Sequence, residues 1–274
     1  MPAGEPSFDD LLREATSAPV AGWDLGRLGE RVQVDVPWDY DAVVSAHTVG
    51  ARSLLDLGTG GGEWLAAHRP LAPLTVATEC WPPNALVAAR TLRPLGAHVV
   101  RVEAADDNDQ QGDNEQQGDN DQQARGPVRG RLPFRDACFD AVVDRNEAFV
   151  ADEVARVLAP GGTFVTEQVG PGCHDDLYTL LELTAPPPAR WALDMAVRQV
   201  RAAGLEVVDA ADGLAVRTFA DMGAVAWWLR QVPWAVEGFT VEGFRDRLAA
   251  AYARGGPYAV REPRFRLVAR RVSG

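Results

Sequence analysis

The stretch Leu54-Leu-Asp-Leu-Gly-Thr-Gly-Gly-Gly-Glu-Trp64 decides the fold of this chain. It opens with an apolar run typical of a buried strand, passes through glycines at positions 58, 60 and 62, and continues into a helical pattern from Glu63. Glycine lets the backbone turn sharply and lets a ligand approach the main chain where a Cβ would collide. A strand, a glycine loop and a helix in this order indicate a nucleotide-type binding site.

Two common nucleotide motifs are excluded by single residues. The dinucleotide fingerprint requires glycine or alanine at the position that Glu63 occupies. A phosphate-binding P-loop requires a lysine, and the sequence contains none. What remains is an acid followed by alternating glycines, filled by Asp56 and the glycines at 58, 60 and 62.

The segments around this loop predict an α/β fold. Strand patterns alternate with helical patterns, which favours a doubly wound, mostly parallel sheet of seven strands with an antiparallel last strand. The expected strands are 53–57, 75–79, 98–104, 140–145, 163–169, 205–211 and 264–270, and the expected helices are 63–68, 83–95, 152–158 and 191–203.

The same patterns predict the domain organisation. We expect an N-terminal helical cap over residues 1–50 and a cofactor-binding core formed by 51–212 and 264–274. An aromatic-rich insertion at 213–263 could be a substrate lid or the core of a small subdomain, and both can hold at once.

A low-complexity acidic loop at 106–126 interrupts the core. It contains three near-identical hexads at 107–124, which lack large apolar side chains, so we interpret it as a solvated insertion. Asp107, Asp109 and Gly112 resemble the start of a calcium-binding EF-hand, but Gly118 stands where that loop needs a bidentate glutamate.

Composition restricts the class of function. The chain has 274 residues and a formal net charge of −12, with no basic block of the kind that grips nucleic acid. No apolar run is long enough to cross a membrane, and there is no secretion signal, so we expect a cytoplasmic protein. Cys80, Cys138 and Cys173 are far apart in sequence, which suggests neither a disulfide framework nor a metal site.

Beyond the glycine loop, three further blocks carry a family resemblance. Glu79 ends the strand after the loop, Leu132–Asp144 leads through the fourth strand, and Val157–Val165 turns into the fifth. With Asp56 and the glycines, these blocks resemble the class I S-adenosylmethionine-dependent methyltransferases, in the same order. The resemblance implies that fold, S-adenosylmethionine as cofactor and S-adenosylhomocysteine as product.

The resemblance also implies roles for individual residues. The loop with Asp56 would line the methionine half of the cofactor, Glu79 would bind the ribose hydroxyls, and Asp106 or Asp107 would lie near the adenine. Tyr40 would contact the methionine carboxylate or simply pack as an amphipathic side chain. The cofactor-binding set is then Tyr40, Asp56, Gly58, Thr59, Gly60, Gly62, Glu79, Asp106, Asp107 and Asn146.

Methyl transfer from a sulfonium is a one-step displacement, so a base is needed only if the acceptor must lose a proton. His174, after the fifth strand, and Glu147, after the fourth, are the candidate catalytic residues; Glu147 could instead orient the cofactor. We expect a methyltransferase acting on oxygen or nitrogen of a small, largely apolar acceptor. An RNA or protein methyltransferase, or a non-catalytic S-adenosylmethionine-binding protein, are the alternatives.

Overall fold

The computed structural model describes residues 6–18, 25–103 and 130–273. The chain forms two compact units, and two strands, β7 and β8, run from one unit into the other. Unit 1 consists of Met1–Pro37, Gly172–Pro188 and Leu214–Pro263. Unit 2 consists of Trp38–Pro171, Ala189–Gly213 and Arg264–Gly274. The low-complexity loop at 106–126, with Asp106 and Asp107, lies outside the described residues.

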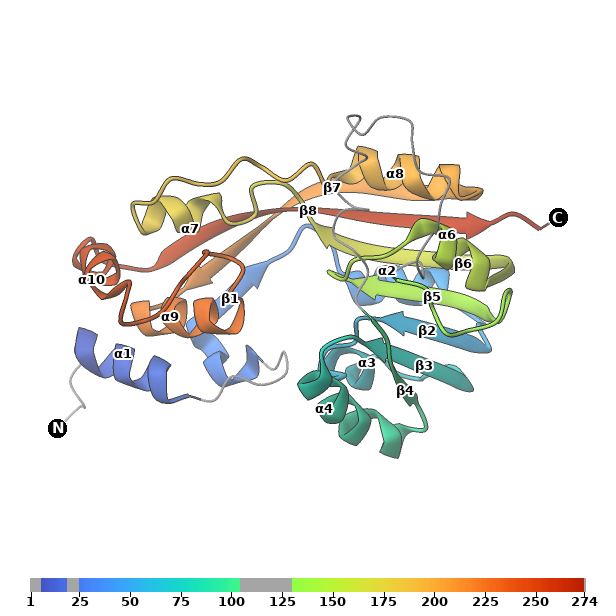
Figure 1. Ribbon diagram of the computed structural model, residues 1–274, viewed down its shortest axis with the longest axis horizontal. Coiled ribbons are helices and arrows are strands. Elements are labelled where there is room, and N and C mark those ends of the chain that lie inside the picture. Colours follow the sequence, from blue (N-terminus) through green and yellow to red (C-terminus); the bar gives the residue numbers. More distant parts are fainter. Residues whose placement is uncertain (1–5, 19–24, 104–129, 274) are drawn as a thin grey trace, which may run out of the picture. The chain divides into compact units, whose positions relative to one another are not determined.

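The sheet has the hydrogen-bonded strand order β1-β7-β8-β6-β5-β2-β3-β4 (Figure 1). Parallel pairing joins β6 to β5, β5 to β2, β2 to β3 and β3 to β4, whereas β8 is antiparallel to β6. The strands are β1 (Val32–Asp35), β2 (Ser53–Leu57), β3 (Leu74–Glu79), β4 (His98–Arg101), β5 (Phe139–Arg145), β6 (Leu158–Val169), β7 (Leu205–Phe219) and β8 (Tyr258–Arg271). The predicted fold class is therefore confirmed.

Helices cover both faces of the sheet in unit 2. Because successive side chains of a strand point to opposite faces, the neighbours Leu54 and Leu55 of β2 belong to two different hydrophobic clusters. One cluster includes residues of α6 (Ala151–Val157) and α8 (Leu193–Ala202), and the other includes residues of α2 (Tyr40–His47), α3 (Glu63–Ala67) and α4 (Pro82–Leu92), which η2 (Arg93–Leu95) extends. Burial on both faces explains why these strands are nearly continuous apolar runs.

Unit 1 is built around one almost entirely buried helix, α9 (Met222–Gln231). Packed with it in one hydrophobic cluster are residues of α1 (Phe8–Ser17), α7 (Asp175–Leu180) and α10 (Arg245–Ala253). Trp227 and Trp228 are 4% and 5% exposed, so these aromatic residues form the core of this unit. In the described part of the chain, no helix combines the length and the apolar character that crossing a bilayer requires.

Several strands differ from the sequence prediction: β4 ends at Arg101 and not at 104, β6 begins at Leu158 and not at 163, and β1, β7 and β8 differ more. The helices expected throughout residues 1–50 are interrupted by β1, which follows η1 (Leu25–Arg31) and pairs antiparallel with the end of β7, from Val32↔Phe219 to Asp35↔Val216. This pairing adds an eighth strand to the expected seven. Strand β7 continues to Phe219 and β8 begins at Tyr258, so part of the expected insertion is extended strand.

Candidate functional site

The glycine loop connects β2 to α3 at the carboxyl edge of the parallel sheet. Gly58, Gly60 and Gly62 have φ values of 61°, 62° and 83°, in the left-handed region that favours glycine. The backbone N–H of Thr59 donates to the Thr78 carbonyl at 2.8 Å, and the Gly60 N–H donates to Glu79 Oε2 at 2.7 Å. The loop is thus fastened to the end of the neighbouring strand β3.

Two of these glycines are required for different reasons. A Cβ on Gly62 would lie 2.8 Å from Leu92 Cγ, so this glycine allows α3 and α4 to pack closely. A Cβ on Gly58 would lie 2.4 Å from Cγ of Glu147, which reaches across from the segment after β5. The bare backbone of Gly58 therefore faces a polar side chain, as a ligand-approach surface does.

A pocket of about 430 Å³, open to solvent, lies beside this surface. Its titratable lining residues are Glu103, Glu147, Glu153 and Cys80, so its described wall carries carboxylates and no arginine. The lining residues are Leu57, Gly58, Thr78, Cys80, Val102, Glu103, Gly130, Leu132, Glu147, Ala148, Phe149, Val150, Glu153 and Val154. Carboxylates accept hydrogen bonds from hydroxyl and amino groups and favour a cationic ligand.

Glu79 lies at the junction of the loop and β3. It is 4% exposed, and its two oxygens accept hydrogen bonds from the backbone N–H groups of Gly60, at 2.7 Å, and Trp81, at 2.8 Å. Burial raises the pKa of Glu79, and these N–H donors oppose that effect. The backbone N–H and the side chain of Cys80 are further hydrogen-bond donors to this carboxylate.

Asp56, at the end of β2, is 3% exposed. Burial is the main cause that raises its pKa to about 7, and the Glu79 carboxylate acts in the same direction. Asp56 is not among the residues that line the pocket. The structure thus places it beneath the glycine loop, where its charge depends on pH.

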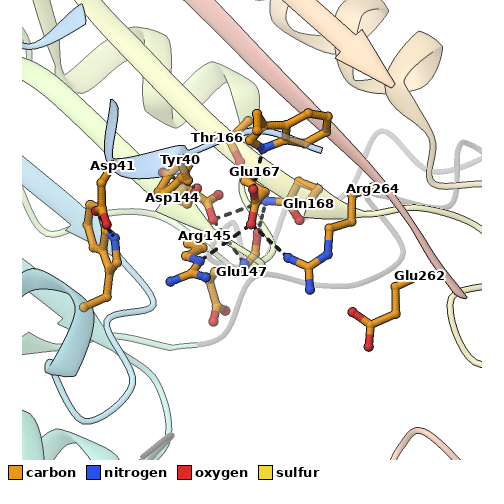
Figure 2. A network of polar contacts seen from close by, with 12 residues as sticks. Tyr40, Asp41, Asp144, Arg145, Glu147, Thr166, Glu167, Gln168, Glu262 and Arg264 are labelled. Atoms are coloured by element: carbon orange, nitrogen blue, oxygen red, sulfur yellow. Dashed lines mark hydrogen bonds and ion pairs between the residues drawn. The ribbon is translucent and has the colours of Figure 1, made fainter. Parts of the chain in front are cut away.

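The segment after β5 is held from below by buried side chains (Figure 2). Asp144 is fully buried and accepts hydrogen bonds from the Glu147 N–H at 3.1 Å and from Gln168 Nε2 at 3.2 Å. Gln168 Nε2 also donates to the Glu147 carbonyl at 3.0 Å. Burial raises the pKa of Asp144 well above its usual value, and the Glu147 charge adds to this effect. The backbone of Glu147 is therefore fixed.

Asn146 and Tyr40 take structural positions around this turn. Asn146 has a φ of 62°, and its N–H donates to the Glu167 carbonyl at 2.8 Å, while its side chain is exposed. The Tyr40 hydroxyl donates to the Asp144 carbonyl at 2.8 Å, and the Tyr40 ring lies 5.3 Å from that of Trp64. Tyr40 thereby holds the end of β5 in place.

Glu167 is a further polar residue that the sequence analysis did not identify. It is 2% exposed at the carboxyl end of β6 and accepts hydrogen bonds from Trp38 Nε1 at 2.5 Å and from Arg264 Nη1 at 2.9 Å (Figure 2). Arg145 Nε lies 3.6 Å from the same carboxylate. The adjacent Glu167 and Gln168 at the end of an apolar strand were the available signal, because parallel strands present their carboxyl ends at ligand sites.

His174 lies in unit 1, immediately before α7. Its ring is 6.2 Å from that of Trp228, in an edge-on arrangement. Burial lowers the pKa of His174. The Glu262 carboxylate opposes this shift, and the Arg217 guanidinium adds to it. Arg217 and Glu262 form a buried ion pair at 2.5 Å. His174 is therefore a neutral imidazole near pH 7, as a proton acceptor must be.

Among the predicted cofactor residues, the structure joins Gly60 to Glu79 by a hydrogen bond and places Gly58, with Glu147, in the wall of the pocket. It adds Glu103, which lies two residues after the end of β4 and lines the pocket. Because the sequence pattern predicts a strand that runs to residue 104, the expected acids are the next ones, Asp106 and Asp107, whereas β4 ends at Arg101. Within the described ranges, no group of three or more His, Cys, Asp or Glu side chains is arranged to hold a metal ion.

Comparison with known proteins supports the fold alone. No protein-family model matches the chain, and a search of curated proteins finds no match. A "putative methyltransferase" from Bacillus halodurans has a TM-score of 0.54 at 21% identity, covering 85% of this chain and 99% of that chain. The YcgJ protein from Bacillus subtilis has a TM-score of 0.55 at 15% identity, covering 86% and 99%.

A third similar structure is the [4+2]-cyclase SpnF, with a TM-score of 0.51 at 18% identity, covering 96% of this chain and 93% of that chain. Together with the strand order, these likenesses confirm the class I methyltransferase fold that the sequence predicts. The fold hosts more than one chemistry, so the activity has to be argued from the site.

Proposed function

We propose that this chain is an S-adenosylmethionine-dependent methyltransferase that transfers a methyl group to oxygen or nitrogen of a small-molecule acceptor by direct displacement. The observation that carries the proposal is the Gly58 surface. A left-handed glycine faces a pocket at the carboxyl edge of the sheet, and the acid that ends the next strand, Glu79, is bonded to the same loop. A nucleoside ligand requires this combination of bare backbone and adjacent carboxylate.

The described residues fit the cofactor. Glu79 would accept the ribose hydroxyls, the loop from Gly58 to Gly62 would hold the methionine half, and Glu103 would lie on the adenine side. When bound, the cofactor supplies an electrophilic methyl group on a sulfonium, and the carboxylates of the pocket complement that positive charge.

Side chains of this chain would supply the ligand contacts and the proton acceptor that the reaction needs. Leu57, Phe149 and Val154 give the pocket an apolar wall, against which an apolar part of the ligands would pack. The neutral imidazole of His174 would accept the proton that a hydroxyl or ammonium acceptor must lose. Glu147 is the second candidate for this role, since its backbone is fixed and its side chain lies against Gly58.

A small acceptor is favoured over nucleic acid by charge. The chain carries 39 acidic residues against 27 basic ones, and all of its cations are arginines. Recognition of phosphate backbones depends on concentrated cations, and the described residues of the pocket wall include none. We also propose a cytoplasmic location, in keeping with the wide spacing of Cys80, Cys138 and Cys173 in the sequence, which does not suggest a disulfide framework.

Calorimetric titration of the purified protein with S-adenosylmethionine and S-adenosylhomocysteine tests the proposal directly. Binding of both is expected, and binding of neither would refute it. Conversion to S-adenosylhomocysteine in the presence of candidate acceptors then tests transfer.

A second candidate is a protein that uses the same fold and cofactor site without methyl transfer. The observation in its favour is that the fold is also that of a [4+2]-cyclase. Tight cofactor binding without turnover across a broad acceptor panel would favour this alternative.

A further inference from the structure

Arg145 presents a charged group at the carboxyl end of β5 that folding alone does not explain. Its side chain is 42% exposed, and its guanidinium lies over the ring of Tyr40, 5.9 Å from the ring centroid. Among the described residues, the one carboxylate within 4.0 Å is that of Glu167, at 3.6 Å. That distance is beyond a hydrogen bond, so the N–H groups of Arg145 are not used by this contact.

Glu167 forms only a long ion pair with Arg145, at 3.6 Å. Its carboxylate is engaged at shorter distance by Trp38 Nε1 and Arg264 Nη1, at 2.5 and 2.9 Å. This carboxylate therefore does not occupy the hydrogen-bonding edge of the Arg145 guanidinium. Asp144, the preceding residue, does not balance the charge of Arg145, because burial raises the pKa of Asp144 well above the usual value and favours its neutral form.

The guanidinium is nevertheless held in a defined place. Tyr40, beneath it, is 6% exposed and is fixed by its hydrogen bond to the Asp144 carbonyl. Glu167, 3.6 Å from the guanidinium, is fixed by its hydrogen bond from Trp38 (Figure 2). An exposed arginine that an aromatic ring and a buried acid already hold in place has little further side-chain entropy to lose when it binds a ligand. Its planar fork matches the two oxygens of a carboxylate.

We propose that Arg145 binds a carboxylate of the methyl acceptor, so that the acceptor is a small organic acid. This inference rests on the proposed function, which identifies the bound ligand as the methyl acceptor. Glu147, two residues further along, lines the pocket and lies against Gly58. A ligand held at Arg145 would therefore extend toward the cofactor site, and the half-buried Trp38, with Arg266 over its ring at 5.6 Å, offers a surface for an apolar body.

The test compares 4-hydroxybenzoate with 4-hydroxybenzamide, which share a ring and a hydroxyl and differ in charge. Both are titrated calorimetrically into the full chain saturated with S-adenosylhomocysteine, as wild type, Arg145→Gln and Arg145→Lys. The matched control is Arg52→Gln, an exposed arginine that precedes β2 at the amino end of the parallel strands. Affinity for S-adenosylhomocysteine is measured separately for every variant.

We expect the wild type and Arg52→Gln to bind the acid at least about tenfold more tightly than the amide, the scale of one charge-assisted bidentate pair. Arg145→Gln should lose this preference, and Arg145→Lys should keep part of it. Equal affinity for acid and amide, an unchanged preference in Arg145→Gln, or no binding of the acid would overturn the proposal. If the acid binds through Arg145 but neither form of the cofactor binds, the proposed function fails and the carboxylate site stands.

Discussion

Replacing Gly58 by alanine tests whether the bare backbone at this position serves a ligand. The variant has to hold a residue with a Cβ at a φ of 61°, which costs about 1–2 kcal/mol. The new methyl group would also lie 2.4 Å from Glu147 Cγ, an overlap that costs about 1–3 kcal/mol. We therefore expect Gly58→Ala to lower the free energy of unfolding by about 2–5 kcal/mol in urea denaturation.

The double variant Gly58→Ala/Glu147→Gly separates the two reasons for a glycine. Glycine is needed at 147 because Glu147 Cβ would itself lie 2.5 Å from the new methyl group. Removing the whole Glu147 side chain relieves the overlap, so, with Glu147→Gly alone as the reference, about 1–3 kcal/mol of stability should return. Cofactor affinity should not return, because the methyl group at position 58 still occupies the approach surface. Calorimetry should show S-adenosylmethionine binding weakened roughly 5- to 150-fold relative to Glu147→Gly alone, which corresponds to that same 1–3 kcal/mol.

Equal affinity of the double variant and Glu147→Gly would refute this reasoning. Gly58 would then exist to accommodate Glu147, and the glycine loop would be a tight turn without a ligand. Loss of affinity in Glu147→Gly itself would instead show that this side chain contacts the cofactor.

Three further predictions concern titratable residues. Glu79→Gln should weaken S-adenosylhomocysteine binding roughly 10- to 150-fold, which corresponds to about 1.5–3 kcal/mol for a hydrogen bond to a charged group. In the same calorimetric comparison, an analogue that lacks both ribose hydroxyls should bind the wild type and the variant equally. Asp56 has a pKa of about 7 in the folded protein, above its unfolded value, so its ionisation makes wild-type stability fall between about pH 4 and pH 7. Asp56→Asn should therefore gain stability relative to wild type as pH rises, by at most about 4 kcal/mol, and a constant difference between pH 5 and pH 8 in urea denaturation would contradict this. If His174 is the base, kcat should stay level from pH 8 to pH 6.5, because burial lowers the pKa of this residue. The variant His174→Gln should then lower kcat by roughly 10²- to 10⁴-fold without changing cofactor affinity. An unchanged pH profile in that variant would assign the proton transfer elsewhere.

The sequence was most informative where one local pattern determined one structure. Strand β2 (Ser53–Leu57) matches its predicted bounds, because a short apolar run that ends in glycines favours a buried strand over a helix. The ends of β7 and β8 were missed because their added residues pair within unit 1, where polar residues such as Arg217 and Glu262 are buried as an ion pair. A polar residue in sequence gives no sign that a distant partner will neutralise it.

The candidate site divides in the same way. Gly58, Gly60 and Glu79 were predicted because the family motif is local, and the structure bonds this loop to this acid. The network on Glu167 was not predicted, since Trp38, Arg145 and Arg264 come from segments far apart in the chain and meet only through strand pairing. A single sequence carries no information on which of its arginines will share a carboxylate.

The place of β8 in the sheet has a consequence for synthesis of the chain. In the observed order β8 lies between β6 and β7, so β7 and β1 can join the other strands only through β8. On the ribosome, β2 to β6 can assemble early, but β6 keeps an open edge until residues 258–271 have emerged. An open strand edge is a template for pairing with other chains. Nascent chains that stall before residue 258 should therefore be the species most prone to aggregate and the ones that chaperones bind.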